Sequence, residues 1–267
     1  MSGERPPVLF LPGGVTPVAP SYAPLLAELG DSIRPVLKEL EVYSGDVPPA
    51  DYSIAMEADA VARTADSIGL STFHIVGFSG GGAVALAFAA RYPERLRSLA
   101  MFEPANVPGA WDPDERADWE AFSEGMDDLP PEAFIEQFTR RQLRPEAVPP
   151  PPPDPPPAWM ARRPAGLRAM IRAFSEDETD RGAWSKVTCP VYLAYGLLTA
   201  EYMVRRVRRL AGLFPDIWIH AYPGIHHFVP PQRSRPAEYA GALRRLWARA
   251  EEREPTTPGR GDGDYAA

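Results

Sequence analysis

A serine flanked by glycines is the residue best placed to do chemistry. The segment Gly77-Phe78-Ser79-Gly80-Gly81 follows a short apolar run at 73–76 and precedes an alanine-rich helical pattern at 83–91. This is the strand, turn and helix context of a nucleophile elbow, in which a tight turn lifts a serine hydroxyl above a sheet. Glycines two residues before and after the serine remove side chains that would collide, and the helix start favours developing negative charge. The pattern predicts that Ser79 is a nucleophile.

The same turn has two other interpretations. One is an ordinary glycine-rich connection between a strand and a helix. The other is a dinucleotide-binding loop, but its G-x-G-x-x-G fingerprint needs a glycine where Ser79 stands. The nucleophile is therefore the favoured interpretation.

A serine hydroxyl needs a base, and the chain has four histidines. His74 and His220 fall within predicted strands and are expected to be structural. His226 and His227 follow the last predicted strand, so either ring is able to reach the serine from that loop.

Short apolar runs alternate with helical patterns on both sides of a long middle segment. This alternation predicts an α/β fold with a mostly parallel sheet and helices on both faces. The expected strands are 8–11, 36–43, 73–76, 97–102, 191–195 and 217–222, and the expected helices are 21–29, 53–68, 83–91, 199–213 and 236–250.

Proline makes up 33 of the 267 residues, well above its usual share of about 5%. Fifteen prolines lie between Pro104 and Pro164, and eight of these occupy 149–157. Such a tract excludes helix and central strand and favours polyproline II, more as a stiff spacer than as a ligand for a proline-binding module. The segment 104–185 is thus predicted to be a helical, proline-broken insertion.

The chain resembles the α/β-hydrolase family over about 8–103 and 186–250. Besides the elbow, Phe10-Leu11-Pro12-Gly13-Gly14 is similar to the Leu-His-Gly oxyanion loop of the family. Pro223-Gly224-Ile225-His226-His227-Phe228 is similar to its Pro-Gly-x-x-His-Phe block.

The resemblance implies a role for each matching residue. Ser79 is the nucleophile, and His227 is the base because it precedes the phenylalanine, which leaves His226 at the pocket mouth. The backbone N–H groups of Gly14 and Gly80 form the oxyanion hole. Pro12 replaces the usual histidine, with no expected loss because the donors lie further along.

The acid of the triad has two candidates. Thr199 stands where the family usually has an aspartate, on the loop after the strand 191–195. Glu103 ends the strand 97–102, where some members, including certain haloalkane dehalogenases, place their acid. Glu201 is two residues late on the usual loop and falls in a predicted helix. Glu103 is favoured, since a buried carboxylate needs a partner such as an imidazole N–H.

The resemblance also gives a domain organisation. Residues 1–103 and 186–252 form the hydrolase core, 104–185 form a cap, and 253–267 are expected to be disordered. Large apolar side chains of the cap are divided between its own core and an apolar substrate pocket: Trp111, Trp119, Phe122, Phe134, Phe138, Trp159, Met160, Met170 and Phe174.

The predicted function is a cofactor-independent serine hydrolase that cleaves an apolar carboxylic ester, thioester or lactone through an acyl-enzyme. Serine at the elbow disfavours epoxide hydrolase and haloalkane dehalogenase chemistry, which use aspartate there. Two alternatives stay open: a C–C bond hydrolase or lyase on the same triad, and a non-hydrolytic protein that binds or cyclises a ligand in the same fold.

The composition of the chain limits the kinds of molecule that it is expected to bind. The formal charge of −8 argues against nucleic-acid binding, and the single cysteine, Cys189, excludes an internal disulfide framework and a CxxC metal site. No apolar run approaches the length of a membrane span or a signal-peptide core. We expect a cytoplasmic enzyme with a small apolar substrate and no metal, and the sequence leaves its oligomeric state open.

Overall fold

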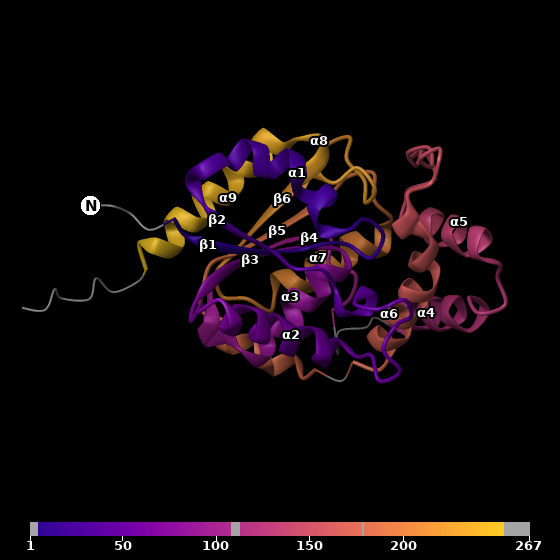
Figure 1. The fold of residues 1–267 in the computed structure, drawn as a ribbon, viewed down its shortest axis with the longest axis horizontal. Helices are drawn as coiled ribbons and strands as arrows, with labels where there is room; N and C mark the ends of the chain where they lie inside the picture. Colours follow the sequence, from indigo (N-terminus) through magenta and orange to yellow (C-terminus); the bar gives the residue numbers. More distant parts are fainter. Residues whose placement is uncertain (1–4, 108–112, 178, 254–267) are drawn as a thin grey trace, which may run out of the picture.

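The computed structural model describes residues 5–107, 113–177 and 179–253. These residues form a six-stranded parallel sheet with the strand order β2-β1-β3-β4-β5-β6 (Figure 1). The α/β class and the parallel sheet predicted from the alternation are confirmed. The strands are β1 (Pro7–Leu11), β2 (Arg34–Leu37), β3 (Phe73–Phe78), β4 (Leu96–Phe102), β5 (Val191–Gly196) and β6 (Ile217–Tyr222).

Helices cover both faces of the sheet. In Figure 1, α1, α8 and α9 lie on one side of the strands, and α2 and α3 lie on the other. Side chains of α7 join the same core cluster as those of α2 and α3. These helices are α1 (Val18–Leu29), α2 (Ile54–Ser67), α3 (Gly80–Arg91), α7 (Glu201–Ala211), α8 (Pro231–Ser234) and α9 (Pro236–Glu251).

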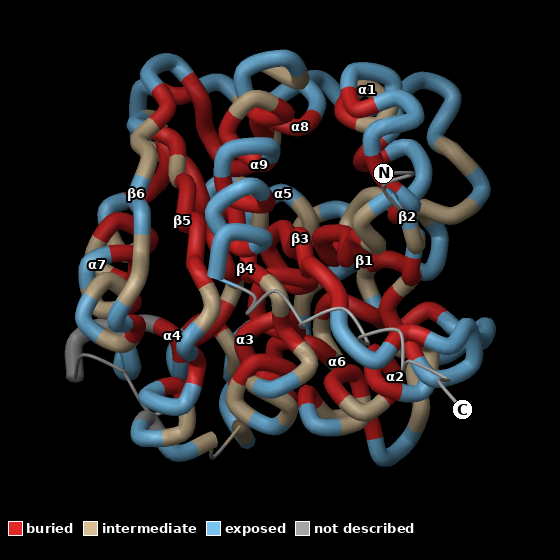
Figure 2. Tube along the Cα trace, turned by 90° about the vertical axis from the view of Figure 1, so that its left-hand side faces the viewer, coloured by how far each residue is buried: buried red, intermediate tan, exposed pale blue. Residues whose placement is uncertain are grey.

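The core is divided by the sheet into two clusters. Successive residues of a strand point to opposite faces, so Leu9 and Leu11 of β1 pack toward α2 and α3, whereas Val8 and Phe10 pack toward α1 and α9. The four inner strands β1, β3, β4 and β5 are therefore buried along most of their length, whereas the edge strands β2 and β6 are mostly intermediate or exposed (Figure 2).

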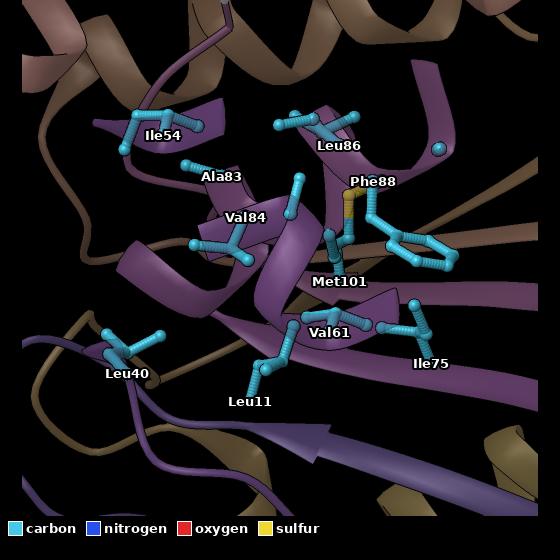
Figure 3. Packing of buried hydrophobic residues seen from close by; sticks show 14 of the residues in the cluster. Leu11, Leu40, Ile54, Val61, Ile75, Ala83, Val84, Leu86, Phe88 and Met101 are labelled. Atoms are coloured by element: carbon cyan, nitrogen blue, oxygen red, sulfur yellow. The ribbon is translucent and has the colours of Figure 1, made fainter. Parts of the chain in front are cut away.

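The cluster under α2 and α3 fixes the helix that follows the elbow. Figure 3 shows Leu11, Ile75 and Met101 of neighbouring strands among side chains of these two helices, including Val61 and Val84. Every residue of α3 from Gly80 to Ala89 is buried, which holds the start of this helix firmly at the strand ends.

The insertion leaves the sheet after β4 and returns to it at β5. Its helices α4 (Pro113–Gly125), α5 (Pro131–Arg141) and α6 (Arg163–Ser175) gather beside one end of the sheet (Figure 1). Trp119, Phe122, Phe134 and Phe174 stack in its centre, with neighbouring ring centroids 6.1–6.5 Å apart. The tract 149–157 contains no helix or strand, and most of its residues are exposed.

Several predicted boundaries differ from the structure, and α1 and α3 each begin three residues earlier than predicted, at Val18 and Gly80. The predicted strand 36–43 ends at Leu37 and is followed by a 3₁₀ turn at Glu41–Tyr43. Leu40, Val42 and Tyr43 looked like strand residues because they are apolar, but they are buried under α2, where the carboxylate of Glu57 accepts the Val42 N–H at 3.2 Å.

The helix α7 is two residues shorter at each end than the predicted 199–213, since it runs from Glu201 to Ala211. None of the described helices is long and apolar enough to cross a membrane. Trp111 and most of the predicted disordered tail, 254–267, lie outside the described residues.

Candidate active site

The turn between β3 and α3 holds Ser79 in an unusual backbone conformation, with φ at +51° and ψ at −116°. Its N–H donates to the Phe102 carbonyl at 3.0 Å. A Cβ on Gly77 would lie 2.6 Å from the carbonyl oxygen of Gly81, and one on Gly81 would lie 2.5 Å from two carbonyl oxygens of the β1 loop. Only glycine fits at either place, and this is why the turn can be so tight.

Three buried side chains form a continuous hydrogen-bonded row at this turn. His227 Nε2 lies 2.9 Å from Ser79 Oγ, and His227 Nδ1 lies 2.7 Å from Glu103 Oε2. A carboxylate only accepts, so Nδ1–H donates to Glu103 and Nε2 is left to accept the serine proton. The imidazole also packs on the Phe78 ring, 5.1 Å between centroids, which limits its rotation.

Glu103 is held at both carboxylate oxygens. Its Oε2 contacts His227, and its Oε1 accepts hydrogen bonds from Thr199 Oγ1 at 2.5 Å and from the Gly196 N–H at 2.7 Å. Thr199 is the residue at the family's usual aspartate position, so the loop after β5 contributes a hydroxyl donor instead of an acid. The carboxylate is fully buried and its orientation is fixed.

Backbone strain is concentrated at these residues. Among the described residues, Ser79 and Glu103 are the two non-glycine residues with positive φ, at +51° and +44°. Such conformations cost about 1–3 kcal/mol each and persist where the surroundings enforce them, often at functional sites.

The other acid candidate lies elsewhere. Glu201 is exposed at the start of α7, and its carboxylate pairs with Arg144 at 3.0 Å. The carboxylate that contacts His227 is therefore that of Glu103.

The remaining histidines contact other groups. His226 is buried with its Nε2 3.2 Å from the Val148 carbonyl of the insertion, and burial lowers its pKa. His74 contacts Ser98 Oγ at 2.8 Å, and His220 contacts the Tyr192 hydroxyl at 3.0 Å.

The backbone N–H groups of Gly80 and Gly14 lie close to each other, next to Ser79. Gly80 is the first residue of α3, so its N–H has no acceptor within the helix. The nitrogen of Gly14 is 3.6 Å from the place that a Cβ of Gly80 would take. The Tyr43 hydroxyl fixes the Gly14 loop by donating to the Gly14 carbonyl at 2.6 Å.

The insertion covers these groups with apolar side chains. A Cβ on Gly14 would lie 2.6 Å from Leu167 Cδ2 and 3.3 Å from Met170 Sδ, and Met170 also lies against Gly80. Phe138 of α5 meets the ring of Phe228, next to His227, at 6.5 Å between centroids. The surroundings of Ser79 are therefore apolar on the side of the insertion.

Sequence reasoning missed Thr199 as a hydrogen-bond partner of Glu103 and Tyr43 as a hydrogen-bond partner of Gly14. Neither role has a local signal, because each depends on residues more than 25 positions away. The described residues contain no group of three or more His, Cys, Asp or Glu side chains able to hold a metal ion.

Comparison with known proteins identifies the family. The family model described as alpha/beta hydrolase fold matches residues 6–144, about half of the chain. Pimeloyl-[acyl-carrier protein] methyl ester esterase of Chromobacterium violaceum is 28% identical over 211 residues, which cover 76% of this chain and 82% of that protein. A 2-hydroxy-6-oxo-6-phenylhexa-2,4-dienoate hydrolase of Comamonas testosteroni is 33% identical over 112 residues, 40% of this chain and 39% of that protein.

Solved structures show the same fold. A thermophilic esterase from Thermogutta terrifontis superposes with a TM-score of 0.69 at 20% identity, covering 92% of this chain and 90% of that one. A hydrolase from Pseudomonas aeruginosa gives the same TM-score at 18% identity, covering 92% and 91%. Taken with the elbow, the parallel sheet and the family match, these likenesses lead to one conclusion: the chain belongs to the α/β-hydrolase fold family and is an enzyme of the hydrolase class.

Proposed function

We propose that this enzyme is a serine hydrolase that cleaves an apolar carboxylic ester, thioester or lactone through an acyl-enzyme. One observation carries the proposal: the buried row Ser79–His227–Glu103 stands beside the N–H groups of Gly14 and Gly80. A nucleophile, a base, an orienting acid and two oxyanion donors are the parts that acyl transfer requires.

In the first half of the reaction Ser79 Oγ attacks the carbonyl carbon while His227 Nε2 takes the hydroxyl proton. The carbonyl oxygen becomes negative and accepts hydrogen bonds from Gly14 and Gly80. Collapse of the tetrahedral intermediate breaks the bond to the leaving group, which receives the proton from His227. Glu103 stays ionised and stabilises the imidazolium formed between these two transfers.

In the second half a water molecule attacks the acyl-enzyme. His227 takes one proton of this water, and the same two N–H groups hold the second oxyanion. Breakdown of that intermediate releases the carboxylic acid and returns the proton to Ser79 Oγ. Atoms balance as one ester and one water giving one acid and one alcohol.

The segment 104–185 is proposed to act as the cap that forms the substrate pocket. Leu167, Met170 and Phe138 supply apolar surface within reach of Gly14, Gly80 and Phe228. An apolar acyl chain gains about 0.8 kcal/mol for each methylene buried against such surface. The ester class also agrees with the names of the relatives from Chromobacterium and Thermogutta.

The test is covalent labelling by a fluorophosphonate probe, followed by hydrolysis of p-nitrophenyl esters of increasing acyl length. We expect the probe to label the wild type and the control Ser185→Ala, whose serine is exposed, but not Ser79→Ala. An unlabelled wild type, or equal labelling of Ser79→Ala, would reject the serine mechanism and favour a non-hydrolytic binding protein.

A further inference from the structure

One buried arginine close to the Gly14 loop has two guanidinium nitrogens without a hydrogen-bond partner. Arg163 is the first residue of α6 and is 2% exposed. Its Nε and Nη1 atoms are buried and have no hydrogen-bond partner. None of the carboxylates in the described ranges forms an ion pair with it.

The guanidinium lies next to the residues proposed to bind the oxyanion. Its central carbon is 3.8 Å from the centroid of the Tyr43 ring, and the Tyr43 hydroxyl donates to the Gly14 carbonyl at 2.6 Å. The guanidinium and the oxyanion loop are thus separated by one tyrosine side chain.

The face of α6 that carries Arg163 continues over the site. Leu167, one turn further along the helix, lies against Gly14, and Met170, about two turns along, lies against Gly14 and Gly80. Residues three, four and seven apart share a helix face. Along this helix face, Leu167 and Met170 therefore place apolar side chains between Arg163 and the groups beside Ser79.

The other buried lysine and arginine side chains in the described part of the chain have partners. Lys38 donates to Glu41 at 2.8 Å and to the Glu39 carbonyl at 3.0 Å. Arg206 donates to the carbonyls of Pro104 and Ala105. Burying a charged donor without a partner costs free energy. Arg163 therefore differs from Lys38 and Arg206 in having two buried nitrogens without an acceptor.

The position of Arg163 makes this cost larger. The first turn of a helix carries a partial positive charge, and the first turn of α6 contains no acidic residue. Contacts with the Tyr43 side chain and, at 5.3 Å, with the Trp159 ring offset part of the cost but leave Nε and Nη1 without an acceptor. A cation, a helix start and unused N–H groups together fit an anion.

We propose that Arg163 binds a carboxylate at the far end of the substrate, so that the enzyme acts on half-esters of dicarboxylic acids. This inference rests on the proposed ester hydrolysis, and it gives the apolar ester a charged end. The planar guanidinium matches the geometry of a carboxylate. A monoanion fits better than a phosphate, since the neighbouring Arg162 is exposed and donates to the Gly45 carbonyl instead.

The test compares monomethyl and dimethyl esters of succinate, glutarate and adipate, which differ only in the terminal charge. For the best chain length we expect wild-type kcat/KM to be at least 10-fold higher for the half-ester. In Arg163→Met, which keeps the apolar stem, this preference falls by at least 10-fold, mainly through KM. Arg163→Lys recovers part of it, and the control Arg162→Met keeps all of it.

Binding provides a second measurement that does not depend on turnover. In the Ser79→Ala background, calorimetry is expected to show binding of the monomethyl ester that weakens at least 10-fold when Arg163→Met is added. Equal kcat/KM for the charged and neutral esters, or an unchanged Kd in the double variant, would overturn the carboxylate site. The first of these results would leave the proposed function intact, because both esters would still be hydrolysed and Ser79 would still be labelled.

Discussion

At the scale of single residues, the carboxylate beside His227 comes from the end of β4 rather than from the loop after β5. The register pairs Phe102 with Ala194, so Glu103 and the residues that follow β5 emerge at the same edge of the sheet. Thr199 keeps a hydrogen bond at the usual aspartate position, but as a donor to Glu103. The carboxylate therefore starts from a different strand than the usual aspartate would, but it still reaches Nδ1 of His227.

This arrangement predicts different effects for two glutamine variants. Glu103→Gln removes the charge that stabilises the imidazolium and presents an amide to Nδ1, so we expect kcat for an ester to fall by about 10²–10⁴-fold. Glu201→Gln is expected to stay within about twofold of the wild type, because this side chain is exposed and pairs with Arg144. Steady-state kinetics of both variants checks this, and a large loss only in Glu201→Gln would contradict it.

The sequence was sufficient to select Ser79, His227 and Glu103, which the structure brings into hydrogen-bond contact, and their catalytic roles stay predictions. Local motifs around serine and histidine carry that information. The contributions of Thr199 and Tyr43 could not be predicted, because a threonine or a tyrosine has no distinctive spacing. Their contacts arise only when distant loops meet at the strand ends.

At the scale of elements, the elbow depends on close backbone approach. Gly77 faces the backbone of Gly81 and Gly82, which cannot move aside as a flexible side chain could. The same packing holds Ser79 at the start of α3. Tight contacts of this kind make the element sensitive to single added methyl groups.

We therefore predict that Gly77→Ala destabilises the protein by about 3 kcal/mol or more, since the new Cβ meets backbone atoms at 2.6–2.9 Å. Gly125→Ala is the matched control, because nothing lies within 4 Å of its Cβ position at the end of α4. Alanine favours a helix over glycine by up to about 1 kcal/mol, so the control should be neutral or slightly stabilised. Urea denaturation measures both, and equal midpoints would contradict the expected clash.

Element boundaries could be predicted less well than element types. The segment 36–43 has the apolar content of a strand, but of its residues only Val36 and Leu37 pair with β1, and Glu41–Tyr43 form a 3₁₀ turn under α2. Burial of apolar side chains in a turn and in a strand looks the same in a sequence. The contacts of the neighbouring helix decide between them.

At the scale of the whole molecule, alternating strands and helices were enough to predict the doubly covered parallel sheet. The packing of the insertion was not predictable, because its apolar side chains serve both its own core and the cover over Ser79. Trp119 and Phe174 belong to the first group, whereas Leu167 and Met170 lie against Gly14, near Ser79. A helical pattern shows an apolar face but not what that face will meet.

The end of the sheet opposite Ser79 contains a buried group that affects global stability. His74 lies near the start of β3, and burial, with a smaller contribution from Arg97, lowers its pKa to about 3. In the unfolded chain its pKa is about 6.5, so below this pH the unfolded state binds a proton that the folded state does not bind. The contribution of neutral His74 is complete above about pH 6.5 and is lost as the pH falls toward 3.

We predict that the free energy of unfolding decreases between pH 6.5 and pH 4 and that His74→Asn removes part of this decrease. The contribution of one such group is at most about 1.4 kcal/mol per pH unit. Denaturant titrations of both proteins at several pH values measure the difference. A difference that does not change with pH would show that His74 titrates alike in the folded and unfolded chains.

The position of Glu103 at the end of β4 also determines how the reacting groups are distributed along the chain. Gly14, Ser79, Gly80 and Glu103 all precede residue 104, and His227 follows residue 185. No group proposed to take part in bond making lies within the insertion. The segment proposed to shape the pocket is therefore one that evolution or an engineer can exchange as a unit, while the groups proposed to carry the chemistry stay on the sheet.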